Sequence, residues 1–309
     1  MFVVVGEALV DLVGQRGDRT FSALPGGSPA NVALGLARLG VPVTLNTRLG
    51  RDGFGEMVRS HLEASGVRVD GGAGEGAKTT LAIATLAAGI ASYDFRIDWD
   101  VEALVPLPVE TRCLHTGSLA TVLPPGRANV VDLVEREHER GRVTVSYDPN
   151  VRPALLGDAA RARPDIEHLV AMSDVVKVSD DDLRWLYPDR SDEEVAQGWL
   201  ASGPALVVVT RGGAGAYAVS AGLELRRAAV PIDLVDTVGA GDSFTSGLLD
   251  GLLRADLIGG ARRDALATID ETTLGSVVDA AALIAAITCS RPGADPPTRA
   301  EVDAAGRRA

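Results

Sequence analysis

The chain of 309 residues carries a formal net charge of −12, and 46% of its residues are hydrophobic but only 4% aromatic. Because non-specific nucleic-acid binding and adhesion to anionic membranes both need a basic surface, this charge argues against both kinds of partner. The length suits one large domain or two ordinary ones with an aliphatic core.

We expect a soluble cytoplasmic protein. No N-terminal segment has the pattern of a signal peptide, and the longest apolar run, 280–287, is too short to cross a bilayer. The two cysteines, Cys113 and Cys289, are too few for a disulfide scaffold or a metal cluster, so we predict buried reduced thiols. The four histidines lie in separate segments without metal-ligand spacing.

The first strands are predicted at 2–5 and 8–13. Asp11 is the charged residue inside the second strand, and two interpretations of it stay open. Its carboxylate either binds sugar hydroxyls or faces solvent on an edge strand.

A helix of about three turns is predicted after these strands. Ser28 suits the N-cap, Pro29 the first helical position and Gly40 the stop. Asn31 lies in the first turn, behind the pair Gly26-Gly27, which permits close approach of a ligand to the backbone. A strand at 43–47 and a helix at 52–64 are expected to follow.

The stretch 72–79 nearly spells a P-loop, which requires Gly-x-x-x-x-Gly-Lys-Ser/Thr. Ala77 breaks the pattern before Lys78. A P-loop must also open a helix, whereas 80–87 and 92–97 have the pattern of a β-hairpin. We therefore favour a Gly-rich connector and keep a P-loop NTPase as an alternative.

From residue 113 onward the patterns of strands and helices alternate, which predicts a largely parallel sheet with helices on its faces. Ligands in such folds gather at the carboxyl ends of the strands. Polar residues cluster at these ends in four segments: 116–118, 148–152, 177–182 and 210–213.

A second near-motif, 213–218, mimics a dinucleotide-binding fingerprint after a strand. The required helix does not follow, because 217–220 and 223–228 have the pattern of two short strands. This disfavours a nicotinamide-dependent oxidoreductase. The last strong helix is predicted at 273–288.

The segment 236–244 has the strongest chemical signature. Its small residues Gly239, Ala240 and Gly241 let backbone N–H groups converge on an anion at a helix N-terminus. Asp242 stands beside that anion site, where a second negative group is unfavourable unless it handles a proton. We interpret Asp242 as a general base; the alternative is an ordinary helix start with an acidic first turn.

Two stretches together resemble the signatures of the ribokinase-like sugar kinases of the PfkB family. One is 26–33, followed by Gly40 and Gly50 at the positions where the N-terminal signature has glycine. The other is 236–247, which includes Asp242. The resemblance implies a single domain, 1–309, with a three-layer α/β/α sandwich around a largely parallel sheet. It also implies a small β-sheet lid built from about 8–24 and 79–97.

The resemblance also implies roles for individual residues. Asp242 would be the base, with the amides around Gly239, Ala240 and Gly241 as the anion hole. The remaining roles fall into two groups. Residues for the sugar would be Asp11, Gly26, Gly27, Asn31, Asn150 and Arg152, and residues for ATP would be Lys177, Ser179, Thr210, Gly212 and Gly215.

Cations are implied in the same way. The family's Asn-x-x-Glu element aligns with 179–182, so Asp182 is expected on the Mg²⁺ side, although Ser and Asp replace Asn and Glu. A K⁺ site is expected from five residues: Asp236, Val238, Thr288, Arg291 and Gly293. A homodimer formed through the lid is a further expectation.

The expected function is ATP-dependent phosphorylation of a sugar. The motifs at 6–11, 27–31 and 148–152 look most like the fructokinase branch, which implies D-fructose converted to fructose 6-phosphate. 2-Keto-3-deoxygluconate and ribose are the alternatives, and the absence of a Glu near Gly117-Ser118 counts against ribose. A sugar-binding regulator without catalysis is also open, but the retained Asp242 speaks against it.

Overall fold

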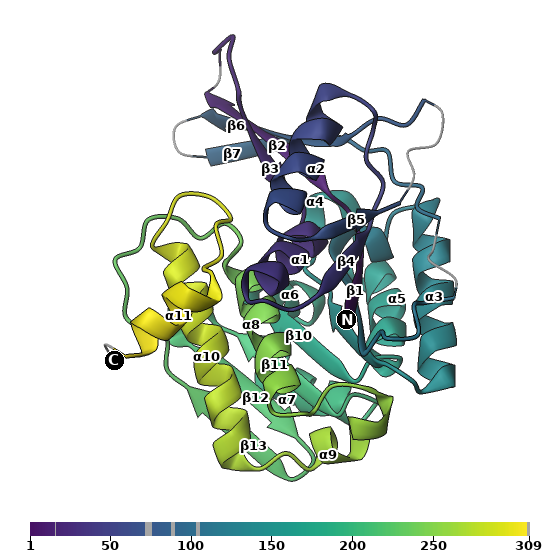
Figure 1. Cartoon of the computed structure of the whole chain (residues 1–309), viewed down its shortest axis with the longest axis vertical. Helices are drawn as coiled ribbons and strands as arrows, with labels where there is room; N and C mark the ends of the chain where they lie inside the picture. The colour runs from purple at the N-terminus through teal and green to yellow at the C-terminus, as the bar shows by residue number, and fades with distance from the viewer. Residues whose placement is uncertain (16, 72–75, 88–89, 103–105, 308–309) are drawn as a thin grey trace.

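A mostly parallel sheet forms the centre of the molecule (Figure 1). The computed structural model describes residues 1–15, 17–71, 76–87, 90–102 and 106–307. The strand order is β13-β12-β11-β10-β9-β8-β1-β4-β5, and the pairs from β11 to β5 are parallel, whereas β12 and β13 are antiparallel. The strands are β1 (Phe2–Val5), β4 (Val43–Asn46), β5 (Arg68–Asp70), β8 (Cys113–Gly117), β9 (Thr144–Asp148), β10 (Val175–Ser179), β11 (Leu206–Thr210), β12 (Ala216–Ser220) and β13 (Leu223–Arg227).

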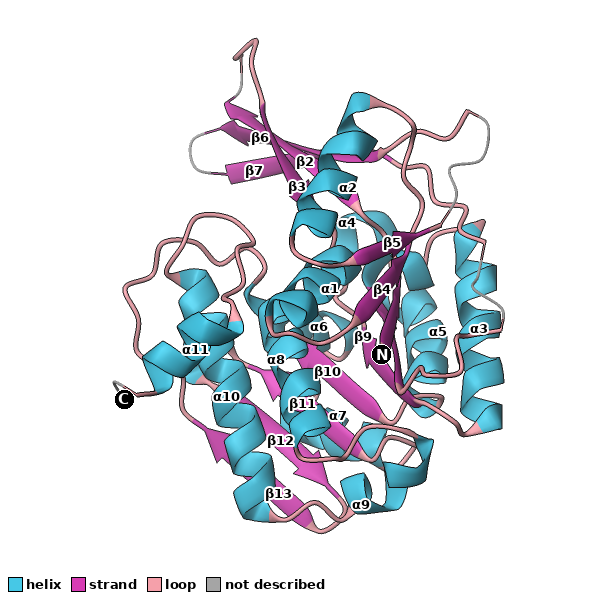
Figure 2. Cartoon of the chain, in the orientation of Figure 1, coloured by secondary structure: helices cyan, strands magenta, loops and turns pink. Residues whose placement is uncertain are grey.

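Helices cover both faces of this sheet (Figure 2), as its continuous buried strands require. One core cluster joins the sheet to α1, α8 and α10, and the other joins it to α3, α5 and α7. The helices are α1 (Ser28–Arg38), α2 (Gly53–Ala64), α3 (Gly126–Arg140), α4 (Pro153–Leu156), α5 (Ala159–Ala171), α6 (Asp180–Leu186), α7 (Asp192–Leu200), α8 (Ala240–Arg254), α9 (Arg263–Ala267), α10 (Glu271–Cys289) and α11 (Arg299–Gly306). The predicted three-layer sandwich is confirmed.

A smaller sheet stands at one end of the molecule (Figure 1). Its order is β3 (Ser22–Gly26), β2 (Leu9–Gln15), β6 (Thr80–Ala87) and β7 (Ile90–Arg96). The predicted hairpin is confirmed, while its joint, 88–89, lies outside the described residues. That this sheet closes as a lid stays a prediction.

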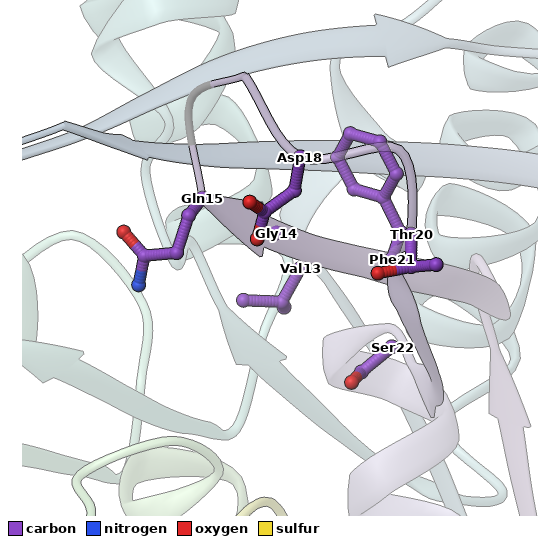
Figure 3. A pocket seen from close by; sticks show the side chains of 7 residues that line it. All are labelled: Val13, Gly14, Gln15, Asp18, Thr20, Phe21 and Ser22. Atoms are coloured by element: carbon purple, nitrogen blue, oxygen red, sulfur yellow. The ribbon is translucent and has the colours of Figure 1, made fainter.

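The small sheet also carries a shallow hollow of about 300 Å³ beside the turn between β2 and β3 (Figure 3). It contains none of the residues predicted for catalysis, sugar or nucleotide. The residues that line it are Val13, Gly14, Gln15, Asp18, Thr20, Phe21 and Ser22.

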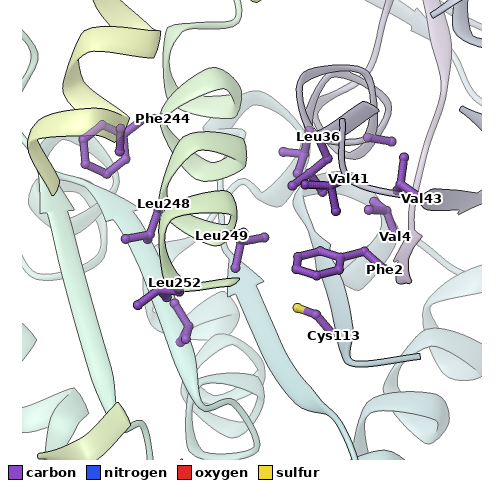
Figure 4. Close-up of a cluster of buried hydrophobic side chains, with 14 of the residues drawn as sticks. Phe2, Val4, Leu36, Val41, Val43, Cys113, Phe244, Leu248, Leu249 and Leu252 are labelled. Atoms are coloured by element: carbon purple, nitrogen blue, oxygen red, sulfur yellow. The ribbon is translucent and has the colours of Figure 1, made fainter. Parts of the chain in front are cut away.

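The helix α8 packs into the core through close contacts with two other helices. Phe244, Leu248 and Leu252 belong to the same buried cluster as Phe2 and Leu36 (Figure 4). This packing fixes the N-terminal turn of α8 relative to α1 and the sheet. The long apolar helix α10 could cross a membrane by length and composition, but it packs against α8 and β13 as a core helix.

Several sequence predictions are wrong in detail. Gly27, not Ser28, is the N-cap of α1, and the Ser28 hydroxyl points to another helix instead of capping its own. The helix α6 was not predicted, because three consecutive aspartates give no apolar periodicity; Ser179 caps it. Cys289 is only half-buried.

The two nucleotide-binding near-motifs do not have the structures they need. Residue Lys78 is exposed on a connector, its N–H donates to Asp98 at 2.8 Å, and a strand rather than a helix follows at Thr80. Residues 72–75 of that motif lie outside the described residues. The segment 213–218 continues into β12, so it lacks the helix of a dinucleotide fold.

Candidate active site

The Asp242 carboxylate lies at the meeting point of α1 and α8. The Ser28 hydroxyl donates to its Oδ1 at 2.6 Å, and the Asn31 amide donates to its Oδ2 at 2.8 Å. Burial raises the pKa of Asp242, although these two hydrogen bonds and the Lys177 charge act in the opposite direction. The result is a fixed carboxylate with an increased affinity for a proton.

The turn before Asp242 requires glycine at its first position. Gly239 has φ +74°, and a Cβ there would lie 2.6 Å from the Cβ of Ala294. Gly239 is the N-cap of α8. The N–H groups that come directly after it in the chain are the first of the helix, and they have no acceptor within the helix. A helix start of this kind favours an anion.

A buried ion pair lies beneath this helix start. The Lys177 ammonium is 2.9 Å from Asp148 Oδ2, and both side chains are almost fully buried. A Cβ on Gly241 would stand 2.9 Å from Lys177 Nζ, which places the ammonium against this glycine in the first turn of α8. Burial lowers the pKa of Lys177, but Asp148, Asp242 and Asp182 outweigh it and the pKa is raised. The lysine therefore adds a permanent positive charge to the helix N-terminus.

Asp11 of β2 lies near enough to Asp242 for the two carboxylates to interact electrostatically. Its Oδ2 would be 2.2 Å from a Cβ on Gly26, so the glycine leaves the space that this carboxylate occupies. Burial raises the pKa of Asp11 to about 6, with Arg152 lowering it and Asp242 raising it. The structure thus brings Asp11, Asn31 and Asp242 together, and Asn31 directly contacts the carboxylate.

Asn150 and Arg152 follow β9 at the same edge of the sheet. Asn150 has φ +38°, and its N–H donates to Asp148 Oδ1 at 3.2 Å. The Arg152 guanidinium donates to Asn150 Oδ1 at 2.6 Å and acts electrostatically on both Asp11 and Asp182. A cation therefore sits among the carboxylates of the site.

Ser179 and Asp182 have structural partners of their own. The Ser179 hydroxyl accepts the Asp182 N–H at 3.0 Å, and Asp182 Oδ1 accepts the Val151 N–H at 3.0 Å. Burial raises the pKa of Asp182 to about 6, and Asp148 contributes to the increase. Within the described part of the chain, no three metal-binding side chains cluster. A Mg²⁺ ion beside Asp182 would therefore need its other ligands from nucleotide phosphates and water.

The predicted nucleotide turn follows β11, next to Ser179 at the end of β10. Thr210 is the register partner of Ser179. Gly215 has φ +94°, and a Cβ there would lie 2.0 Å from the Arg227 carbonyl oxygen. Arg211 pairs with Asp192 and Glu193 in the first turn of α7. The turn leaves Gly212 exposed at the sheet edge where a nucleotide would approach.

The five residues predicted for K⁺ come from the loop before α8 and from the C-terminal end of α10 with the loop that follows it. Asp236 accepts the N–H groups of Val238 at 3.0 Å and Gly293 at 2.8 Å. The Arg291 N–H donates to the Thr288 carbonyl oxygen at 3.0 Å. Carboxylate and carbonyl oxygens are donors suited to a hard cation, so this set fits K⁺ in chemistry.

Sequence reasoning missed three residues of this site: Ser28, Asp148 and Thr245. The Thr245 hydroxyl donates to the Gly241 carbonyl oxygen at 3.0 Å and lies 3.4 Å from Asp148 Oδ2. Ser28 and Asp148 stand inside motifs that the sequence had singled out. A motif does not show which distant residues its members contact, and Ser28 contacts Asp242 while Asp148 contacts Thr245, about a hundred or more positions away.

Comparison with known proteins gives a consistent result. A family model described as pfkB family carbohydrate kinase matches residues 1–301. The chain is 31% identical to a fructokinase from Rhizobium leguminosarum bv. trifolii over 283 residues, 89% of this chain and 85% of that one. It is 32% identical to fructokinase-2 from Solanum habrochaites over 320 residues, covering 97% and 94% of the two chains.

Solved structures show the same similarity. A fructokinase from Xylella fastidiosa with bound ATP superposes with a TM-score of 0.87 at 25% identity, covering 99% of this chain and 98% of that one. A fructokinase double mutant from Vibrio cholerae O395, bound to fructose, ADP and a potassium ion, gives 0.81 at 26% identity with 98% and 97% coverage. An aminoimidazole riboside kinase from Salmonella enterica gives 0.81 at 25% identity with 98% coverage of both chains.

Proposed function

This chain belongs to the pfkB family of carbohydrate kinases, and on that premise we propose that it phosphorylates D-fructose on its 6-hydroxyl with ATP. The observation that carries the proposal is the Asp242 carboxylate, held by Ser28 and Asn31 at the N-terminus of α8. An oriented carboxylate beside an anion site is what direct transfer of a phosphoryl group to a hydroxyl requires.

The proposed reaction is a single displacement. Asp242 takes the proton of the primary hydroxyl as the hydroxyl oxygen attacks the γ-phosphorus, and ADP leaves. The amides of the Gly239-Ala240-Gly241 turn and the Lys177 ammonium stabilise negative charge on the moving phosphoryl group. Mg²⁺, held on the Asp182 side of the site, would neutralise negative charge on the phosphate oxygens. Closure of the small sheet excludes water, which would otherwise compete for the phosphoryl group.

Fructose is favoured over other sugars by the relatives named above, which are fructokinases aligned over most of this chain's length. Asp11, Asn150 and Arg152 would offer a sugar of this class hydroxyl-binding groups of both charges. The competing substrates are 2-keto-3-deoxygluconate, ribose and a riboside such as the one named for the Salmonella relative.

We assign the remaining ligands by the same reasoning. ATP would lie along Ser179, Thr210, Gly212 and Gly215, and K⁺ would lie between the 236–238 loop and the segment 288–293 at the end of α10. A homodimer through the small sheet would cover Phe21 and Leu24, which are 43% and 47% exposed.

Steady-state kinetics with MgATP tests the substrate. We would measure kcat/KM for fructose, tagatose, ribose, 2-keto-3-deoxygluconate and aminoimidazole riboside. The account predicts that fructose exceeds each of the others by at least about tenfold, a difference of about 1.4 kcal/mol in transition-state stabilisation. A tenfold preference for any other sugar refutes the fructose assignment, and no sugar-dependent ADP release refutes the kinase itself.

A further inference from the structure

Glu7 is a buried acid that the proposed mechanism does not use. It follows β1 and is 3% exposed. Its Oε2 accepts the Ala120 N–H at 3.1 Å, and the Ser118 side chain also hydrogen-bonds the carboxyl group. Both partners belong to the short turn Ser118–Thr121 at the carboxyl end of β8. Glu7 therefore connects the first strand to a turn at the ligand edge of the sheet.

This turn needs an external support. Ser118 has φ +55°, a left-handed conformation that costs free energy in a residue other than glycine. Gly117 lies so close to the next strand that a Cβ there would be 2.0 Å from the Asp148 carbonyl oxygen. The two hydrogen bonds to Glu7 compensate for the unfavourable backbone and hold the turn against the strand that precedes Asn150.

The 118–121 turn also supports the small sheet. Leu119 packs with Leu9 of β2 and Ala82 of β6, with Phe95 and Leu155 beside them. These contacts join the large sheet to the two central strands of the small one. A change in the turn would therefore move the small sheet relative to the proposed sugar site.

The backbone around Glu7 also packs against the start of α1. A Cβ on Gly27 would lie 2.6 Å from the Glu7 carbonyl oxygen, and a Cβ on Gly6 would lie 2.2 Å from Pro29 Cγ. The helix that begins there carries Ser28 and Asn31, the two partners of Asp242. Glu7 thus lies between the turn below the small sheet and the helix that holds the catalytic carboxylate.

We infer that Glu7 is a positioning residue for sugar binding: it holds the 118–120 turn, and through Leu119 it seats the small sheet over the sugar site. The inference rests on the proposed function. It concerns the sugar alone, because the nucleotide turn follows β11, four strands away from β1 in the sheet.

Kinetics of Glu7→Ala and Glu7→Gln test this role. Glu7→Ala should raise KM for the preferred sugar about tenfold or more, because two hydrogen bonds to the turn are lost. KM for ATP should stay within about twofold, and discrimination between fructose and its C-4 epimer tagatose should fall. Glu7→Gln keeps an oxygen that accepts the Ala120 N–H, so it should restore most of the sugar affinity.

Glu137→Gln is the matched control, since Glu137 is equally buried but pairs with Arg140 at the end of α3. It should leave both KM values unchanged. The inference is overturned if KM for sugar and ATP rise together, if Glu7→Gln is as impaired as Glu7→Ala, or if the control behaves like either. If Glu7→Ala does not fold, Ser118→Ala offers a second test, because it removes one of the same hydrogen bonds. This variant should raise KM for the sugar and leave KM for ATP unchanged. An unchanged KM for the sugar would overturn the inference. Sugar-dependent turnover of the wild type, measured in parallel, separates this failure from failure of the proposed function.

Discussion

At the residue scale, the site is built from carboxylates that are buried more deeply than their charge favours. Asp11, Asp182 and Asp242 all have a raised pKa, and in each case burial is the largest cause. Lys177 and Arg152 are the cations that act on these acids. Carboxyl groups with raised pKa values beside cations are typical of functional sites. Burying these charged groups costs free energy, so stability alone would favour leaving them in water.

The pair of Lys177 and Asp148 should separate stability from catalysis. Lys177→Met leaves Asp148 buried without its partner, which we expect to destabilise the protein by about 3–5 kcal/mol. Adding Asp148→Asn removes the uncompensated charge and should recover much of that loss in a denaturation experiment. Turnover should stay low in both variants, because the charge under Gly241 is absent from both. Recovery of turnover in the double variant would show that the pair has only a structural role.

Glu7 should make stability depend on pH in a defined direction. Burial raises its pKa from 4.5 to about 7, against hydrogen bonds and Arg152, which lower it. Because the folded state binds this proton more tightly than the unfolded state, the stabilisation is complete below pH 4.5 and is lost as pH rises through about 7.

Glu7→Gln mimics the protonated form and isolates this effect. The free energy of unfolding of the wild type minus that of Glu7→Gln should fall by up to about 3 kcal/mol between pH 4.5 and pH 8. Urea denaturation at several pH values measures the difference. A difference that is constant or rises with pH would contradict the assignment of Glu7 as a buried, proton-binding group.

At the element scale, the packing of α8 decides where Asp242 stands. A Cβ on Gly247 would lie 2.9 Å from Ala281 Cα, and a Cβ on Gly35 would lie 2.3 Å from Ser246 Oγ. Glycines at these crossings let α10 and α1 approach α8 closely. The position of the turn that carries Asp242 therefore depends on helix contacts about one to two turns further along α8.

Gly247→Ala tests this dependence. The added methyl group meets backbone rather than a flexible side chain, so we expect a loss of about 1–3 kcal/mol in unfolding free energy despite the better helix propensity of alanine. Gly53→Ala in α2 is the control, because nothing lies within 4 Å of its Cβ position. It should be neutral or slightly stabilising. Equal effects of the two substitutions would show that α8 does not pack as tightly as described.

Most elements could be predicted from the sequence, but their contacts could not. The strands β1 and β11 are rich in β-branched residues, and the hairpin of β6 and β7 was visible in its alternation. The helix α6 was missed because its first turn is purely acidic. Asn31 was expected to hold sugar hydroxyls, yet its amide binds a carboxylate 211 residues away. Periodicity describes one segment at a time and carries no information about such a meeting.

At the scale of the whole molecule, two sheets meet where the chemistry is expected. The residues proposed for sugar and phosphate come from β2, α1, β9, β10 and α8, and they lie near the carboxyl edge of the large sheet or on the small sheet. The motifs at 26–33 and 236–247 meet because α1 and α8 pack side by side on one face. The family membership, the fold and this geometry agree on a carbohydrate kinase.

The central claim is that Asp242 is the general base of a sugar kinase, and Asp242→Asn tests it most directly. The amide keeps the shape of the side chain but cannot take a proton, so kcat for fructose should fall by about 10²–10⁴. Binding of ATP and fructose, followed by calorimetry, should stay within a few-fold of wild type. A kcat within tenfold of wild type, with both ligands bound normally, would contradict the assignment.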